Sequence, residues 1–241
     1  MGRVLACSDL HGTLSLWRRI QEILKDDDKL YVLGDCADRG YDGWQIIKEA
    51  IKDPRVLYIK GNHDDMLVKA AHHYFHTGSY GRDYSLLRSN GGKRTFEDMK
   101  HDPDNKEWIQ FLNDLPTYEV YHNAMGKTVV CSHAGFTPWK NEDGNLLIPG
   151  DEDLIWDRRH YMDDWVEGEI HENVVVVHGH TPIPYIMDDL RLAYPGDLIE
   201  AGPLWYFKNH KVCLDCAAFA TGAAFLLDLD TFECITVDAE S

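Results

Sequence analysis

We predict an α/β fold for this chain of 241 residues from three features of its sequence. Short apolar runs of strand length recur, segments of helical periodicity separate the first three runs, and two later runs are rich in valine. Alternating strands and helices indicate parallel strands with right-handed crossovers, and valine-rich runs are typical of buried strands. No linker, repeat or low-complexity segment divides the chain, so we expect a single domain over residues 1–241.

The first three strands are expected at residues 4–7, 30–33 and 56–59. Between the first two, the segment TLSLWRRIQEILK repeats apolar residues at i, i+4, i+7 and i+8, which places them on one helical face. The segment DGWQIIKEAIKD carries two isoleucines four residues apart before the third strand, and Pro54 ends it. The chain therefore begins with a βαβαβ unit.

Residues 66–115 are expected to be mostly helical, with breaks at residues 76–84 and 100–105, and we interpret them as a helical insertion over the sheet. The valine-rich strands follow in residues 128–135 and 173–182. Shorter strand-like pieces in the tail, such as KVCLDCAA and GAAFLLDL, suit a second sheet packed on the first.

The net charge of −17, from 24 basic and 41 acidic residues, argues against binding to a nucleic acid backbone or an anionic membrane surface. No run approaches the ~18 consecutive apolar residues of a membrane-spanning helix. The N-terminus, MGRVLACSDLHG, lacks the apolar core of a signal peptide. We therefore expect a cytoplasmic protein with neither nucleic acid nor membrane as partner, and the sequence carries no signal for an oligomeric state.

Of the six cysteines, four lie in or beside apolar runs, where a free thiol behaves as a small hydrophobe. Cys213 and Cys216 form a CxxC pair, but a structural zinc site needs a second pair of ligands, and only His210 lies nearby. We therefore favour free thiols over a zinc site.

Polar residues gather where the predicted strands end. The motifs SDLHG, GDCADRG and KGNHDD follow the first three strands, and both valine-rich strands end in His next to Gly. Ligands of parallel sheets collect at the carboxyl ends of the strands, so these motifs are expected to share one edge. The candidate residues are Asp9, His11, Asp35, Asn62, His63, His133, His178 and His180.

Carboxylate, amide oxygen and imidazole together form a ligand set for first-row divalent metals. The candidates exceed what one site needs, whereas two ions sharing a carboxylate would use them. Two ions ~3.5–4 Å apart can clamp the oxygens of an in-line phosphoryl transfer. A single such motif is usually only a turn, but five of them, each after an apolar run, favour a shared site.

Arginines and a further histidine fit the same chemistry. Arg39 and Arg158 could bind phosphate oxygens, because guanidinium pairs with them in a bidentate manner. His63 could protonate the leaving alkoxide, with Asp38 holding its tautomer and raising its pKa.

The motifs SDLHG, GDCADRG, GNHDD, SHAG and HGHTP, in this order, resemble those of the PPP-type phosphoprotein phosphatases of the calcineurin-like metallophosphoesterase superfamily. The segments SNGGKRTFEDM, FLNDLPTYEV and LIWDR look like those of bacterial members, which include small protein phosphatases and symmetrical dinucleoside tetraphosphatases. The likeness runs over about residues 3–232. It implies an α/β fold with a central β-sandwich of mixed sheets flanked by helices.

The resemblance also implies roles for the candidate residues. Asp9 and His11 would hold the first metal ion, Asp35 would bridge both ions, and Asn62, His133 and His180 would complete the second. His63 would be the general acid, paired with Asp38, and Arg39 and Arg158 would bind the phosphate. A hydroxide bridging the metals would be the nucleophile. Two divalent ions are implied, Mn²⁺ first, with Fe or Zn²⁺ as alternatives.

Some positions depart from the family pattern. Asp64 stands where most members have Glu, Ser8 replaces a common Gly, and LDCAA at residues 214–218 replaces the usual Asp-Thr-Gly-Ala. None of these changes removes a metal ligand. In HGH, the family position favours His180 as the ligand, with His178 as a neighbour.

We expect a phosphomonoesterase that acts on phosphoserine or phosphothreonine in proteins, with phosphotyrosine as a further substrate class. Symmetrical hydrolysis of diadenosine tetraphosphate or related nucleotides is the second enzyme hypothesis, and the expected partner is a phosphoprotein or a small phosphorylated substrate. A noncatalytic binding scaffold is the third, and loss of ligands or of the His63–Asp38 pair would be its signature. Both are intact here. The negative charge and the Asp-Arg-Gly loop count against a nuclease.

Overall fold

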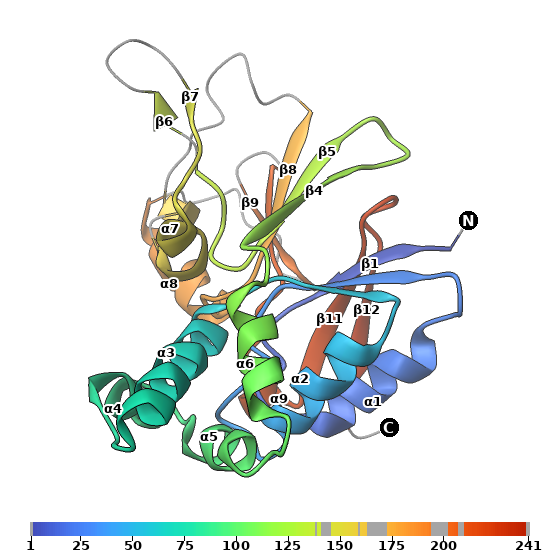
Figure 1. Ribbon diagram of the computed structural model, residues 1–241. Coiled ribbons are helices and arrows are strands. Elements are labelled where there is room, and N and C mark those ends of the chain that lie inside the picture. The colour runs from blue at the N-terminus through green and yellow to red at the C-terminus, as the bar shows by residue number, and fades with distance from the viewer. Residues whose placement is uncertain are drawn as a thin grey trace.

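The computed structural model describes residues 2–137, 139–140, 146–158, 160–162, 173–193, 202–206 and 210–239. Two five-stranded sheets stack on each other, and most helices cover the outer face of the first sheet (Figure 1). The architecture is thus the predicted sandwich of two mixed sheets flanked by helices.

The first sheet has the strand order β12-β11-β1-β2-β3. Its strands are β1 (Val4–Cys7), β2 (Lys29–Val32), β3 (Val56–Tyr58), β11 (Ala223–Asp228) and β12 (Cys234–Asp238). Strands β1, β2 and β3 are parallel, as predicted, and α1 (Leu14–Ile23) and α2 (Gly43–Lys52) form the crossovers. The strand β11 runs antiparallel to β1 and pairs with β12.

The second sheet has the order β4-β5-β8-β10-β9. Its strands are β4 (Tyr118–His122), β5 (Thr128–Ser132), β8 (Val174–His178), β9 (Leu204–Tyr206) and β10 (Lys211–Cys213). The valine-rich strands β5 and β8 are parallel neighbours. The short strands β6 (Trp139–Lys140) and β7 (Leu146–Leu147) pair antiparallel in a separate two-stranded sheet.

The expectation that both tail segments belong to a second sheet is wrong for one of them. The segment KVCLDCAA supplies β10 of the second sheet, but GAAFLLDL supplies β11, which completes the first sheet beside β1. An apolar strand pattern reports burial and not the identity of the neighbouring strand, because pairing partners are chosen by packing.

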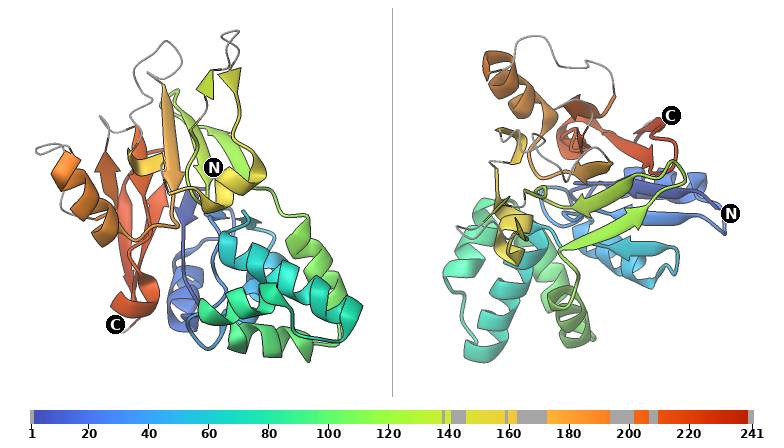
Figure 2. Two further views of the ribbon diagram at one scale, coloured as in Figure 1. Left: turned by 90° about the vertical axis from the view of Figure 1, so that its left-hand side faces the viewer. Right: turned by 90° about the horizontal axis from the view of Figure 1, so that it is seen from above.

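Alternation along the strands separates two parts of the core. On β1, Ala6 faces the second sheet and contributes to a cluster with Val129, Val175 and Leu227 from both sheets. Its neighbours Leu5 and Cys7 point the other way, into a cluster lined by helices. Helices α1 to α6 occupy that outer side of the first sheet (Figure 2).

Four helices connect β3 to β4: α3 (Asn62–Thr77), α4 (Arg82–Ser89), α5 (Lys93–Lys100) and α6 (Asn105–Asn113). The two predicted breaks lie where helices end, and a third, unpredicted break separates α4 from α5 at residues 90–92. The helical region also begins at Asn62 rather than near residue 66, so two candidate site residues belong to the first turn of a helix.

Four further helices lie in the part of the chain that the structure describes. They are α7 (Asp151–Trp156), the 3₁₀ helix η1 (His160–Met162), α8 (Ile183–Ala193) and α9 (Ala218–Thr221). Within the part of the chain that the structure describes, no helix is both long and apolar enough to cross a membrane.

All six cysteines are free thiols. The Cys213 thiol donates to the carbonyl of Thr181 at 3.4 Å, and that of Cys216 donates to the carbonyl of Ala223 at 3.0 Å. Among the described residues, neither belongs to a group of side chains that could hold a metal ion.

One departure from the family pattern has a cost in stability. Ala217, at the position of the usual glycine, is left-handed with φ 58° and ψ 53°. This conformation costs an L-residue about 1 kcal/mol. A glycine would remove that strain, but it would also raise the entropy of the unfolded chain, which offsets part of the gain in stability. We expect Ala217→Gly to raise the melting temperature by about 2 °C in a thermal scan.

A control for that substitution lies in α9, the helix that Ala217 precedes. Ala220 is helical, and glycine there costs about 1 kcal/mol, so Ala220→Gly should lower the melting temperature. Equal shifts for both variants would contradict the strain assigned to Ala217.

Candidate active site

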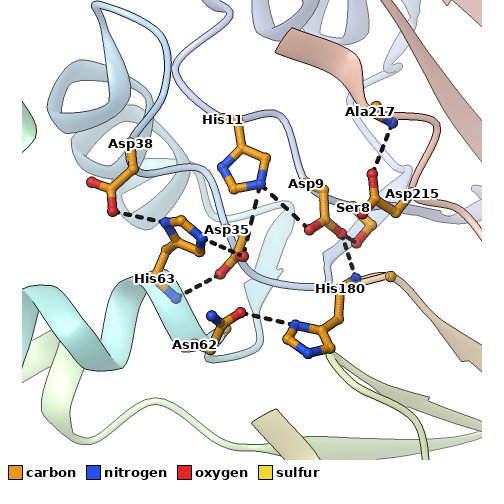
Figure 3. Close-up of polar contacts among 12 residues, drawn as sticks. Ser8, Asp9, His11, Asp35, Asp38, Asn62, His63, His180, Asp215 and Ala217 are labelled. Carbon is orange, nitrogen blue, oxygen red and sulfur yellow. Dashed lines mark hydrogen bonds and ion pairs between the residues drawn. The ribbon is translucent and has the colours of Figure 1, made fainter. Parts of the chain in front are cut away.

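The carboxyl ends of five strands bring the candidate residues together. Asp9 and His11 follow β1, and Asp35 follows β2 (Figure 3). In the second sheet, His133 follows β5 and His180 follows β8. Asn62 and His63 open helix α3, which follows β3. Residues 9, 11, 35 and 180 have positive φ angles between 43° and 68°, a strained conformation that clusters at functional sites.

Asp35 lies at the centre of the cluster and is 2% exposed. Its Oδ2 atom lies 3.3 Å from Nε2 of His133 and 3.9 Å from Nε2 of both His11 and His63. Burial raises the pKa of Asp35, but the facing His133 and His63 outweigh burial and hold that pKa well below its usual value. The central carboxylate is therefore ionised.

On one side of Asp35 lie Asp9 and His11. The Nδ1–H of His11 donates to the carbonyl of Ala37 at 3.0 Å, so its Nε2 is the nitrogen left for a metal. This Nε2 lies 3.7 Å from Asp9 Oδ1, a buried oxygen with no hydrogen-bond partner among the described residues. Burial lowers the pKa of His11 to about 3, so the ring is neutral, as a metal ligand must be.

On the other side, three ligand atoms converge. Asn62 Oδ1 lies 2.9 Å from both His133 Nε2 and His180 Nδ1, and these two nitrogens are 3.2 Å apart. Ligands bound at about 2.1 Å to one ion lie roughly 3 Å from one another. The Nδ1–H of His133 donates to the carbonyl of Leu33 at 2.7 Å, which directs its Nε2 toward this point.

The residues present fit a pair of divalent cations. Asp35 belongs to both groups of side chains that could hold an ion, one with His11 and His63 and the other with Asp9 and His133. Burial lowers the pKa of His133, but the carboxylates of Asp35 and Asp9 raise it to about 10. The carboxylates therefore attract positive charge, which protons supply in the metal-free protein and cations would replace.

His63 lies at the edge of this cluster. Its Nδ1 lies 2.8 Å from Oδ2 of Asp38, whose backbone N–H donates to Thr95 Oγ1 at 3.1 Å. Burial lowers the pKa of His63, but Asp35 and Asp38 outweigh it and raise that pKa. The geometry offers two uses of this ring: a proton carrier held by Asp38, or a third ligand beside His11 and Asp35.

Both candidate arginines are exposed. Burial lowers the pKa of His11, and the charge of Arg39 adds to that lowering. Burial also lowers the pKa of His180, and the charges of His133 and Arg158 lower it further. The segment of Arg158 is fixed to the core, because the buried Lys211 donates to the carbonyl of His160 at 2.6 Å.

The two histidines of HGH point to different neighbours. The ring of His180 meets Asn62 and His133, and its backbone N–H donates to Asp9 Oδ2 at 3.0 Å. The ring of His178 packs edge-on against His160, with the ring centroids 5.0 Å apart. The structure thus separates the two candidates that the sequence left together.

Sequence reasoning assigned no role to three buried residues beside the ligands. Asp64 accepts from the backbone N–H groups of Asp35 and Gly61 and from the hydroxyl of Tyr58. The Ser8 hydroxyl donates to Asp9 Oδ2 in a short hydrogen bond. Asp215 follows the buried strand β10, a position like those of the other motifs, so the same strand-end signal could have identified it.

Two mixed sheets whose strand ends carry side chains that could hold a pair of metal ions are typical of metallophosphoesterases. The calcineurin-like phosphoesterase family matches residues 2–214, and the chain belongs to this family. Members use two metal ions in phosphoester hydrolysis. The likeness to the superfamily of PPP-type phosphatases is thereby confirmed.

Several solved structures share the fold. A candidate diadenosine tetraphosphatase aligns over 98% of this chain and 93% of its own, with 20% identity and a TM-score of 0.60. A serine/threonine phosphatase from Saccharomyces cerevisiae aligns over 100% and 81%, with 13% identity and a TM-score of 0.54. A metallophosphoesterase from Sphaerobacter thermophilus aligns over 98% and 87%, with 14% identity and a TM-score of 0.52. No curated protein matches the sequence significantly.

Proposed function

We propose that this protein is a dinuclear-metal phosphatase that hydrolyses phosphomonoesters, with phosphoserine and phosphothreonine proteins as its substrates. The observation that carries the proposal is the position of Asp35, whose Oδ2 lies 3.3 Å from Nε2 of His133 and 3.9 Å from Nε2 of His11. One carboxylate between two ligand sets is the arrangement that a pair of ions needs.

In this proposal Asp9 and His11 hold one ion, and Asn62, His133 and His180 hold the other, with Asp35 shared. Mn²⁺ is the proposed metal, and Fe or Zn²⁺ suits the same donors. The bound ions would activate water and offset the charge of the transferring phosphoryl group.

The other side chains act on the substrate. Arg39 and Arg158, which are both exposed, bind and orient the phosphate oxygens. His63 donates a proton from Nε2 to the leaving oxygen, while its Nδ1 stays hydrogen-bonded to Asp38 at 2.8 Å. Water attacks phosphorus directly, so the chain itself is not phosphorylated.

A comparison of phosphopeptides with a dinucleotide tests the proposal. Purified protein with Mn²⁺ is assayed on a phosphoserine peptide, a phosphothreonine peptide and diadenosine tetraphosphate, and kcat/KM is measured for each. We expect the peptides to be the better substrates. A preference of a hundredfold or more for the dinucleotide would overturn the choice of substrate and leave the metal chemistry intact.

Symmetrical hydrolysis of diadenosine tetraphosphate is the second candidate. The alignment with a candidate diadenosine tetraphosphatase, which spans nearly all of both chains, favours it. A noncatalytic scaffold would instead fail on a generic aryl phosphate although two metals are bound. The intact pair of His63 and Asp38 argues against that role.

A further inference from the structure

We propose that Phe219 is a positioning residue for the substrate phosphate, because its ring holds the guanidinium of Arg39 beside the metal-ligand cluster. This inference rests on the proposed function, in which Arg39 binds phosphate. It assigns a role to Phe219 of α9, a residue that none of the sequence motifs included.

The contact between the two side chains is direct. The guanidinium carbon of Arg39 lies 5.0 Å from the centroid of the Phe219 ring, within the range of a cation–π interaction. The same ring meets His11 edge-on, with the centroids 6.2 Å apart. Phe219 is 48% exposed, so its ring lies at the surface of the site and not in the core.

Contacts with two neighbouring loops hold the backbone around Arg39 in place. The N–H of Gly40 donates to the carbonyl of His11 at 2.9 Å. The loop before α5 presses against the same turn, since a Cβ atom on Gly91 would lie 3.0 Å from the backbone nitrogen of Arg39. The side chain itself is exposed, and an unrestrained arginine would lose rotamer entropy on binding phosphate. Contact with Phe219 restricts the guanidinium in advance and lowers that cost.

Asp215, which precedes α9, holds the helix that carries Phe219 next to the site. Asp215 Oδ1 accepts the backbone N–H of Ala217 at 2.8 Å, just before α9 begins (Figure 3). The backbone carbonyl of Asp215 accepts the N–H of Ile183 at 2.8 Å. Asp215 is buried and lies near Asp9 and Ser8, so α9 keeps a fixed position relative to the metal ligands.

Phosphate binding measures this role without requiring turnover. Titration calorimetry of Mn²⁺-loaded protein with inorganic phosphate should show binding weakened about two- to fivefold by Phe219→Ala, the range expected for an exposed cation–π contact. KM should rise by the same factor, while kcat and metal content stay unchanged. Phe219→Tyr keeps the ring and should bind like the wild type. Phe111→Ala, which removes an equally exposed ring from α6, is the matched control.

A double variant separates positioning from general destabilisation. If Phe219 acts through Arg39, then Arg39→Ala combined with Phe219→Ala should bind phosphate no more weakly than Arg39→Ala alone. Additive losses, unchanged binding by Phe219→Ala, or no phosphate binding by the wild type would each overturn the inference. Wild-type protein that binds phosphate but hydrolyses no phosphoester would instead reject the proposed function alone.

Discussion

Asp35→Asn should reduce turnover to below about 1% of the wild type and remove most of the bound metal in the same step. The substitution keeps the shape of the side chain but takes away the charge shared by both ligand sets. Removing a group that only hydrogen-bonds to a metal ligand already lowers metal affinity about ten- to a hundredfold. Removing the shared carboxylate itself should weaken the binding of both ions. Metal content by elemental analysis and kcat on an aryl phosphate would measure the two effects.

The fold should survive this change. Asp35 Oδ1 accepts the backbone N–H of His63 at 3.0 Å, and an asparagine oxygen can accept the same hydrogen bond. Asp28 provides a matched control, because it is a buried carboxylate just before the same strand β2, paired with Arg3. We expect Asp28→Asn to lower the melting temperature but to keep both metals. Asp35→Asn protein with two bound ions would contradict the role assigned to Asp35.

His63→Asn should lower kcat by about 10²- to 10⁴-fold, the usual contribution of a general acid, while both metal ions remain bound. Asparagine cannot supply the proton that the leaving oxygen needs. A leaving group that is already a good one needs less protonation, so the loss should be smaller for p-nitrophenyl phosphate than for an alkyl phosphate. This dependence on the leaving group identifies a proton donor rather than a structural residue.

Metal analysis of the same variant decides between the two uses of the ring. His63 Nε2 lies 3.9 Å from Asp35 Oδ2, and the ring groups with His11 and Asp35 as a possible ligand set. Loss of one ion from His63→Asn would make it a ligand and refute its role as the acid. His72→Asn, on the exposed side of the same helix α3, should change neither metal content nor kcat.

Local sequence signals located much of this protein. Apolar runs followed by polar motifs predicted β1, β2, β3, β5 and β8, and the polar residues after them proved to be close together. Such signals are readable because a strand's period and its end are determined by neighbours within a few residues. The helices α1 and α2 were predicted for the same reason.

The tertiary structure alone decided which distant groups meet. The amide of His180 reaches Asp9, 171 residues away, and β11 joins the first sheet instead of the second. The contact of Phe219 with Arg39 likewise has no local signature. Sequence by itself therefore determined the kinds of ligand and the strand ends that carry them. Sheet order and packing decided which of their atoms face one another, because these depend on the burial of whole elements and not on any short stretch of chain.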